Sequence, residues 1–224
     1  MVASENALRL KRMWSKKKMR NAPFALIAEN YEHRELISRL IRRDLDSRFR
    51  APLLGYSWAI IEPLLLALVY SFVFGIIVGR SDPLYPAIVM IGVIGWSLFS
   101  RCMTSTTKTL TSNASLFQFT KIPKSVFAIS NMLTNLLLSF ISLFALIPFI
   151  YLNDLSLNTG YLLLPIYLFL LAITGTAIGL LIAPAAVRIP DLVNIIQFIS
   201  RVGFFLSPVM WTYQMLSSKF GTGQ

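Results

Sequence analysis

The chain has few of the residues on which enzymatic and metal chemistry usually depends. Among its 224 residues there is one cysteine, Cys102, and one histidine, His33. A single cysteine excludes an intrachain disulfide and a cysteine-only zinc site, and a single histidine excludes a histidine-rich metal site. The chain also contains no GxxxxGK[ST] phosphate-binding loop, so it does not hydrolyse ATP by that device. The sequence therefore predicts a chain that is not an enzyme and binds no cofactor of its own.

Acidic residues are scarce as well. The chain contains ten Asp and Glu residues and 21 Lys and Arg residues, which gives a net charge of +11. Most of the basic residues lie in the first fifty positions. This clustering is typical of a cytosolic flank beside anionic lipid, and it argues against a nucleic-acid-binding surface. Residues 1–22 lack the apolar run of a signal peptide, so we expect the N-terminus to stay attached and cytosolic.

Apolar residues are abundant, because 55% of the chain is hydrophobic. A soluble domain of this length would carry far more charge, so the excess must face lipid. Five apolar segments, each about as long as the roughly 20 residues that span a bilayer, occur near 57–79, 84–103, 125–151, 160–187 and 192–214. The prediction is an all-α polytopic membrane protein whose membrane domain covers residues 56–224.

An amphipathic segment precedes these spans. Between residues 29 and 49, apolar residues recur at helical spacing while arginines occupy the other positions; the apolar set is Leu36, Ile37, Leu40, Ile41, Leu45 and Phe49. Such a helix can lie in the membrane interface, in contact with lipid, or it can pack on a soluble partner. Residues 1–55 are thus expected to form a cytosolic basic segment and an interfacial helix.

The loop charges predict one orientation. With a cytosolic N-terminus, the stretch 101–124 and the turn at Arg188 are cytosolic, and they carry most of the basic loop residues. The outer connections, 80–84 and 152–159, contain only Arg80 as a basic residue. The positive-inside rule therefore supports this topology, in which five spans bring the chain's end to the outer side.

Two ionisable residues lie inside predicted spans, where desolvation is costly and a functional role is the default hypothesis. They are Glu62, near the cytosolic start of the first span, and Arg201, near the centre of the fifth. Arg201 is a candidate to bind a phosphate of an anionic substrate, because guanidinium pairs well with phosphate oxygens. The alternative is a structural partner, either Glu62 or backbone carbonyls near Pro208.

Aromatic residues gather in the first and fifth spans. Aromatic faces can stack on sugar rings and tolerate sliding, so Tyr70, Phe198 and Phe204 are candidates for a pore face. Anchoring at the membrane interface is the simpler interpretation of Trp58, Trp211 and Tyr213.

Two further motifs have a functional and a plain interpretation. Asp44-Leu45-Asp46 has the DxD form of metal-dependent glycosyltransferases, but its helical setting among arginines favours local ion pairing. The polar stretch 104–121 contains Asn113, which can cap a short helix whose apolar residues insert into a partner's groove. Those residues are Leu116, Phe117 and Phe119; a solvated loop is the alternative.

The order of several short motifs resembles one known family. They are the run 43–50 (RDLDSRFR), the run 54–64 (LGYSWAIIEPL), Trp96 and Phe99 followed by Asn113, Leu116, Pro123 and Lys124, the turn Arg188-Ile189-Pro190-Asp191, and the run 204–209 (FFLSPV). In this order over residues 36–216 they resemble a type-2 ABC transporter permease of the polysaccharide exporter family, which exports O-antigen, teichoic acid or capsular polysaccharide. Glu62 stands where many O-antigen permeases carry Asn or Gln, and Lys124 stands where Arg is commoner.

The resemblance implies several further expectations. The chain would be a permease subunit of the cytoplasmic membrane, working as a homodimer with a separate ABC ATPase that uses ATP and magnesium. Its substrate would be a lipid-linked glycan, and the region 113–119 would contain the helix that docks on the ATPase. The family has six spans, so this chain is expected to lack the last one. A type-2 ABC permease for a drug or small lipid, and a membrane-embedded glycosyltransferase, are the alternatives.

Overall fold

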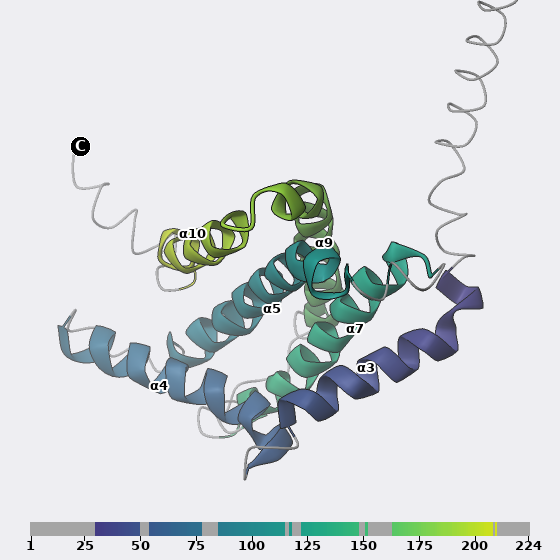
Figure 1. The fold of residues 1–224 in the computed structure, drawn as a ribbon. Coiled ribbons are helices and arrows are strands. Elements are labelled where there is room, and N and C mark those ends of the chain that lie inside the picture. Colours follow the sequence, from purple (N-terminus) through teal and green to yellow (C-terminus); the bar gives the residue numbers. More distant parts are fainter. Residues whose placement is uncertain are drawn as a thin grey trace, which may run out of the picture.

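A computed structural model of the chain describes residues 30–49, 54–77, 85–114, 117, 122–147, 151, 163–207 and 209. The described residues form helices and contain no strand (Figure 1). The helices are α3 (Arg34–Phe49), α4 (Trp58–Ile77), α5 (Tyr85–Ser112), α7 (Lys124–Leu143), α9 (Leu164–Arg188) and α10 (Leu192–Leu206), with short 3-10 turns η1 (Gly55–Ser57) and η2 (Phe144–Leu146). The predicted all-α class is confirmed.

Each predicted span has a helix in the structure. Three of the described helices are long and apolar enough to cross a membrane. They are Tyr85–Ser112, Lys124–Leu146 (α7 together with η2) and Leu164–Arg188. α4 and α10 are also apolar, but the described part of the fifth predicted span ends well before residue 214. These helices agree with a polytopic membrane protein.

The apolar stripe of α3 packs against the protein itself. Ile37 and Leu40 are buried in one cluster with Val126 and Phe127 at the start of α7, and α3 runs beside α7 (Figure 1). The stripe is therefore not free to insert into lipid. The outer face of α3 is polar, with exposed Arg34, Arg39, Arg42 and Arg43. The location of α3 in the membrane interface stays a prediction that depends on this basic face.

A tight turn joins α3 to α4. Gly55 has a φ of +47°, a conformation in which a side chain would be strained, and this explains the glycine after Leu54. The Ser57 amide donates to the Leu54 carbonyl over 3.0 Å. Phe49 at the end of α3 stacks on Tyr56, with 4.6 Å between ring centroids. The Leu-Gly pair thus turns the chain from the α3 direction into the first span.

α5 is longer than the sequence indicated. The prediction ended the second span at residue 103 and assigned 101–124 to a cytosolic stretch, but the helix continues to Ser112. The hydroxyls of this segment bond back to carbonyls of their own helix: Thr104 to Ser100 over 2.8 Å and Thr107 to Met103 over 2.8 Å. A polar helical segment of this kind has no hydropathy signal that separates it from a loop. The expectation that the stretch after residue 103 is a loop was therefore wrong for residues 104–112, which are helical.

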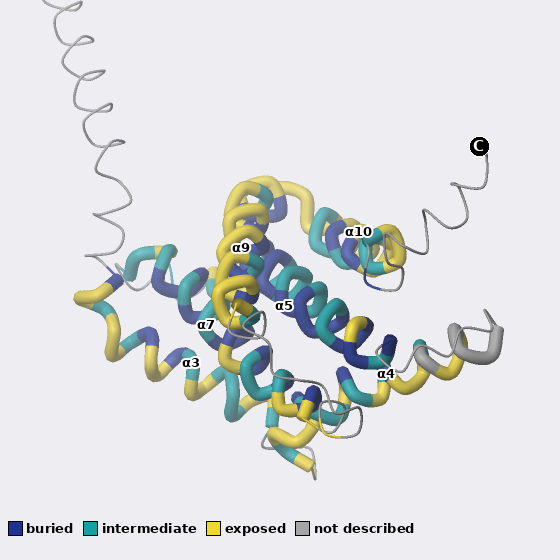
Figure 2. The backbone as a smooth tube through the Cα atoms, turned by 180° about the vertical axis from the view of Figure 1, so that it is seen from behind, coloured by how far each residue is buried: buried dark blue, intermediate teal, exposed yellow. Residues whose placement is uncertain are grey.

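Two glycines bring α9 into close contact with α5. A Cβ placed on Gly175 would lie 2.6 Å from the Phe99 carbonyl oxygen, and one on Gly179 would lie 2.6 Å from that of Met103. Their GxxxG spacing places both on one face, as in closely packed membrane helices. The opposite face of α9 is exposed and apolar (Figure 2), as expected for a surface toward lipid.

Replacement of Gly179 by leucine should separate α5 from α9. The larger side chain has no room beside the Met103 carbonyl, so we expect a loss of roughly 1–3 kcal/mol in the free energy of unfolding. Thermal unfolding of the detergent-solubilised protein measures this loss. Ala177→Leu on the exposed face of the same helix is the matched control and should leave the midpoint unchanged. Equal midpoints for both variants would contradict the proposed close contact.

Candidate functional site

A cavity of about 620 Å³ lies between α4, α5 and α10. In Figure 1, α10 lies above α5 and α4 lies below it, and all three helices contribute residues to the cavity wall. The wall combines aromatic rings, charges and small polar groups, which are Glu62, Leu66 and Tyr70 of α4, Val93, Trp96, Ser97, Ser100, Arg101 and Thr104 of α5, and Gln197, Ser200, Arg201, Phe204 and Phe205 of α10.

Four of the five residues predicted for a substrate pathway line this cavity. Glu62, Tyr70, Arg201 and Phe204 lie on its wall, and the rings of Tyr70 and Phe204 are 5.7 Å apart. Phe198 does not line the cavity and is 64% exposed on α10. The structure thus brings together residues from two predicted spans and leaves Phe198 on another face of its helix.

Glu62 forms an ion pair with Arg101, a residue that the sequence did not single out as its partner. The Arg101 Nη2 lies 2.9 Å from the Glu62 Oε2, and both side chains are partly exposed to the cavity. Among the described residues Glu62 is paired with Arg101 and not with Arg201, and Pro208, near the other proposed partners of Arg201, lies outside them. Arg201 itself is exposed and has neither a hydrogen bond nor an ion pair with another residue that the structure describes. The cavity wall carries two guanidinium groups and one carboxylate, a net positive charge.

Trp96 holds α10 at the edge of the cavity. Its indole N–H donates to the Ser200 carbonyl over 3.0 Å, and its ring occupies the space beside Gly203, where a Cβ would lie 2.8 Å from the ring. A second close contact joins Gly92 of α5 to Val209, just beyond α10. Sequence reasoning noted Trp96 only within a family motif, because no local pattern pairs it with a glycine more than a hundred positions away.

Asn113 and Phe117 form the turn that follows α5. The Asn113 side-chain amide donates to the Thr109 carbonyl over 3.0 Å, so it caps the end of α5. The backbone carbonyl of Asn113 accepts from the Phe117 backbone amide over 3.2 Å. The half-buried Phe117 ring packs edge-on against Phe127 at 5.1 Å. Leu116 and Phe119, predicted for the same contact surface, lie outside the described residues. A role of this turn in docking stays a prediction.

The acidic motif in α3 is an ion-paired element. Arg43 Nη2 lies 3.0 Å from the Asp44 Oδ1, which confirms the interpretation of local pairing for Asp44. Within the described part of the chain, no group of three His, Cys, Asp or Glu side chains is placed to hold a metal ion.

Comparison with known proteins identifies relatives over most of the chain. Residues 35–221 match the family model described as ABC-2 type transporter. The O-antigen export system permease protein RfbA of Klebsiella pneumoniae is 24% identical over 187 residues, which are 83% of this chain and 72% of the relative. RfbA of Myxococcus xanthus is 26% identical over 190 residues, with the same coverage. The polysialic acid transport protein KpsM of Escherichia coli is 23% identical over 188 residues, 82% of this chain and 72% of the relative.

Trp96→Phe should loosen α10 while keeping an aromatic ring beside Gly203. The Ser200 carbonyl would lose its indole donor, so we expect a loss of about 1 kcal/mol in stability. Thermal unfolding in detergent measures it, with Trp58→Phe as the control because Trp58 is 42% exposed. If Trp96→Phe unfolds at the wild-type midpoint, the indole bond does not hold α10.

Proposed function

Because the chain belongs to the ABC-2 type transporter family, we propose that it is the membrane-spanning permease subunit of an exporter that moves a polysaccharide or polyol-phosphate polymer on a lipid carrier. The relatives whose names refer to O-antigen export and polysialic acid transport support this substrate class. The observation that carries the proposal is the cavity between α4, α5 and α10, in which aromatic rings and guanidinium groups share one wall.

The chemistry of this cavity suits a charged sugar polymer. The rings of Tyr70, Trp96, Phe204 and Phe205 offer flat faces on which sugar rings stack without a fixed register. Ser97, Ser100 and Gln197 add hydrogen-bonding groups beside them. Arg201, which has no partner among the residues that the structure describes, offers a planar set of donors for a phosphate or carboxylate. A cavity for a drug or small lipid would be expected to be more apolar and would not need these charges.

The open side of the cavity supports a homodimer. In a single chain, Arg201 and the Glu62–Arg101 pair would face lipid along the opening, and charges at such depth are costly without water or protein around them. A second copy across the opening encloses these groups in a shared, hydrated passage. Two copies of this chain therefore form the pathway in our proposal.

Energy for export comes, in this proposal, from a separate ABC ATPase that uses ATP and magnesium. The chain is placed in the cytoplasmic membrane with its N-terminus in the cytosol, as the basic N-terminal segment supports. α5 continues from the cavity residue Trp96 to Ser112 as one helix, followed directly by the turn at Asn113 and Phe117. Movement of an ATPase docked at this turn can thus reach the cavity through a single rigid helix.

Arg201→Gln should reduce polymer export roughly tenfold, since it removes charge-assisted hydrogen bonds to the polymer or its carrier. Cell-surface polymer per unit of membrane-inserted permease measures the effect in cells that express the partner ATPase. Arg201→Lys keeps the charge and should retain intermediate export. Arg188→Gln removes an exposed arginine outside the cavity and should export normally. Unchanged export by Arg201→Gln would contradict the role of this residue.

Phe117→Asp should reduce the amount of ATPase subunit that co-purifies with the permease. Because Phe117 also packs on Phe127, the control is Phe127→Ala, which loosens the same contact from the buried side. We expect Phe127→Ala to retain the ATPase and Phe117→Asp to lose most of it, with both variants still folded by size-exclusion chromatography. Retention of the ATPase by folded Phe117→Asp would remove this residue from the docking surface.

A further inference from the structure

A second group of polar side chains joins α3 to the bundle on the far side of Arg101. Its centre is Asn135 of α7, which is 1% exposed. Arg48, near the end of α3, donates from Nη1 to the Asn135 Oδ1 over 3.1 Å. The predicted substrate and coupling residues include neither Arg48 nor Asn135, so the role of this contact is open.

The amide of Asn135 is held in one orientation. Its Nδ2 donates to the Asn131 carbonyl over 2.8 Å and to the Ser105 Oγ over 3.3 Å. Because both donor bonds go to acceptors of α5 and α7, the amide oxygen is left to face Arg48. The buried Asn135 therefore positions one edge of the Arg48 guanidinium and leaves its other donors available.

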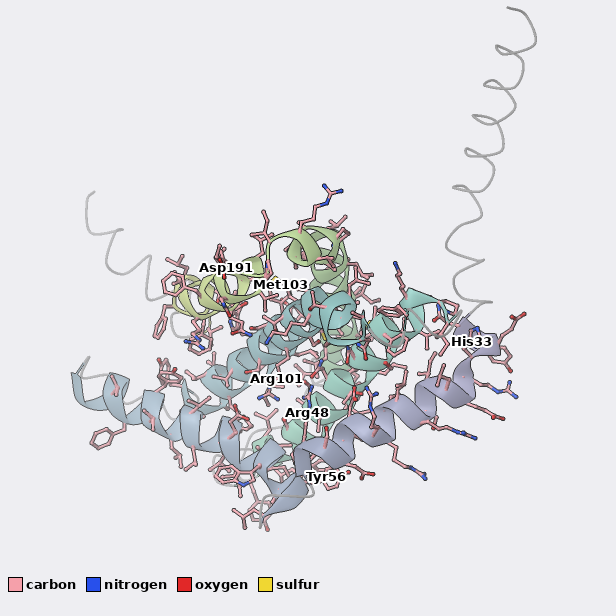
Figure 3. The ribbon with its side chains drawn as sticks, viewed as in Figure 1. His33, Arg48, Tyr56, Arg101, Met103 and Asp191 are labelled. Carbon is pink, nitrogen blue, oxygen red and sulfur yellow. The ribbon has the colours of Figure 1, made fainter. Side chains whose placement is uncertain are left out.

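Arg101 lies close to this point. It precedes Ser105 by four residues on α5, so the two are on one face about one helical turn apart. Figure 3 shows the Arg48 and Arg101 side chains near one another between α3 and α5. Partial desolvation and the nearby charge of Arg101 lower the pKa of the Arg48 guanidinium, which agrees with this proximity.

The charges at this junction do not balance. Arg101 forms its ion pair with Glu62. Asp44 interacts with Arg48 through its charge, but its direct ion pair is with Arg43. The carboxylate of Glu62 is bound to Arg101 and not to Arg48, and each guanidinium keeps several N–H donors beyond the single partner described for it. Two like charges that lie close to one another are costly unless an anion or water lies between them.

We propose that Arg48 and Arg101 together bind a phosphate-type anion, a phosphate or pyrophosphate group, at the junction of α3 and α5. Planar guanidinium groups match the oxygen geometry of such anions, and two of them suit a group with more than one negative charge. Asn135 is a positioning residue that fixes Arg48. Glu62 is a competing anion for Arg101, so binding weakens the Glu62–Arg101 pair.

The position of the junction indicates where such an anion would come from. Arg101 lines the cavity with Arg201, while Arg48 belongs to the helix that precedes the first span. An anion bound between Arg48 and Arg101 therefore lies at one margin of the cavity. This source of the anion rests on the proposed function, in which a lipid carrier bears the phosphate.

Binding of two probes to the full-length chain in phosphatidylcholine nanodiscs tests the site. The soluble probe is radiolabelled inorganic pyrophosphate, and the lipid probe is a long-chain polyprenyl phosphate detected by native mass spectrometry. We expect Arg48→Gln and Arg101→Gln each to weaken binding roughly tenfold, because each removes charge-assisted hydrogen bonds. We expect Glu62→Gln to strengthen it, since the competing carboxylate is lost. Binding of the lipid probe alone would assign the anion to a lipid carrier, whereas binding of pyrophosphate as well would include soluble phosphates.

Two charge-matched controls separate this site from general attraction. Arg39→Gln and Glu35→Gln alter exposed charges on α3 and should leave both affinities within about twofold of the wild type, because surface charges are screened. If Arg48→Gln does not fold, Arg48→Lys and the opposite effect of Glu62→Gln still test the pair. The inference would be overturned if neither probe binds, or if Arg39→Gln loses as much affinity as Arg48→Gln.

The two proposals can fail separately. If the Arg48 and Arg101 variants bind both probes like the wild type while Arg201→Gln loses export, the anion site is wrong and the proposed function stands. If the pair binds the probes but the assembled transporter exports no polymer, the anion site stands and the proposed function is contradicted.

Discussion

A charged side chain inside a bilayer must be paired, hydrated or enclosed by protein, and this constraint organises the structure. Glu62, Arg101 and Arg201 lie on helices with few other charged residues, and all three face one cavity between α4, α5 and α10. Glu62 and Arg101 meet at 2.9 Å, whereas Arg201 has no such partner in the described part of the chain. The bundle therefore needs water, a substrate or a second copy at its open side. The same requirement makes a membrane pathway the natural interpretation of the cavity.

α5 connects the parts that this pathway needs. The glycines of α9 pack closely against the Phe99 and Met103 carbonyls of α5, and this contact holds α9 against α5. Trp96, on the same helix, holds α10 through the Ser200 carbonyl. Toward its end, the Thr109 hydroxyl accepts from Asn131 of α7 over 3.0 Å. One continuous helix thus touches the cavity, the packing core and the turn proposed for ATPase docking, so displacement at one end affects the others.

Much of the class and part of the site could be predicted from the sequence. Hydropathy and charge asymmetry act locally, and they predicted the spans and the candidates Glu62 and Arg201, while the aromatic content of the spans suggested Tyr70 and Phe204. Contacts between distant segments carry no such local signal. For this reason the Glu62–Arg101 pair, the burial of the α3 stripe by α7 and the orientation of Phe198 away from the cavity were not foreseen. The polar end of α5 was predicted to be a loop, because the sequence does not show whether a hydroxyl bonds to its own helix or to water.

The central claim is that the polymer passes through the cavity between α4, α5 and α10. The most direct test replaces one α10 residue at a time with a photo-crosslinking amino acid and illuminates cells during export. Gln197 lines the cavity, and Ile195, two positions away, is 48% exposed and does not line it. Our account predicts that the polymer becomes attached to the permease from position 197, only while the ATPase is active, and not from position 195. Equal attachment from both positions, or attachment from 195 alone, would contradict it.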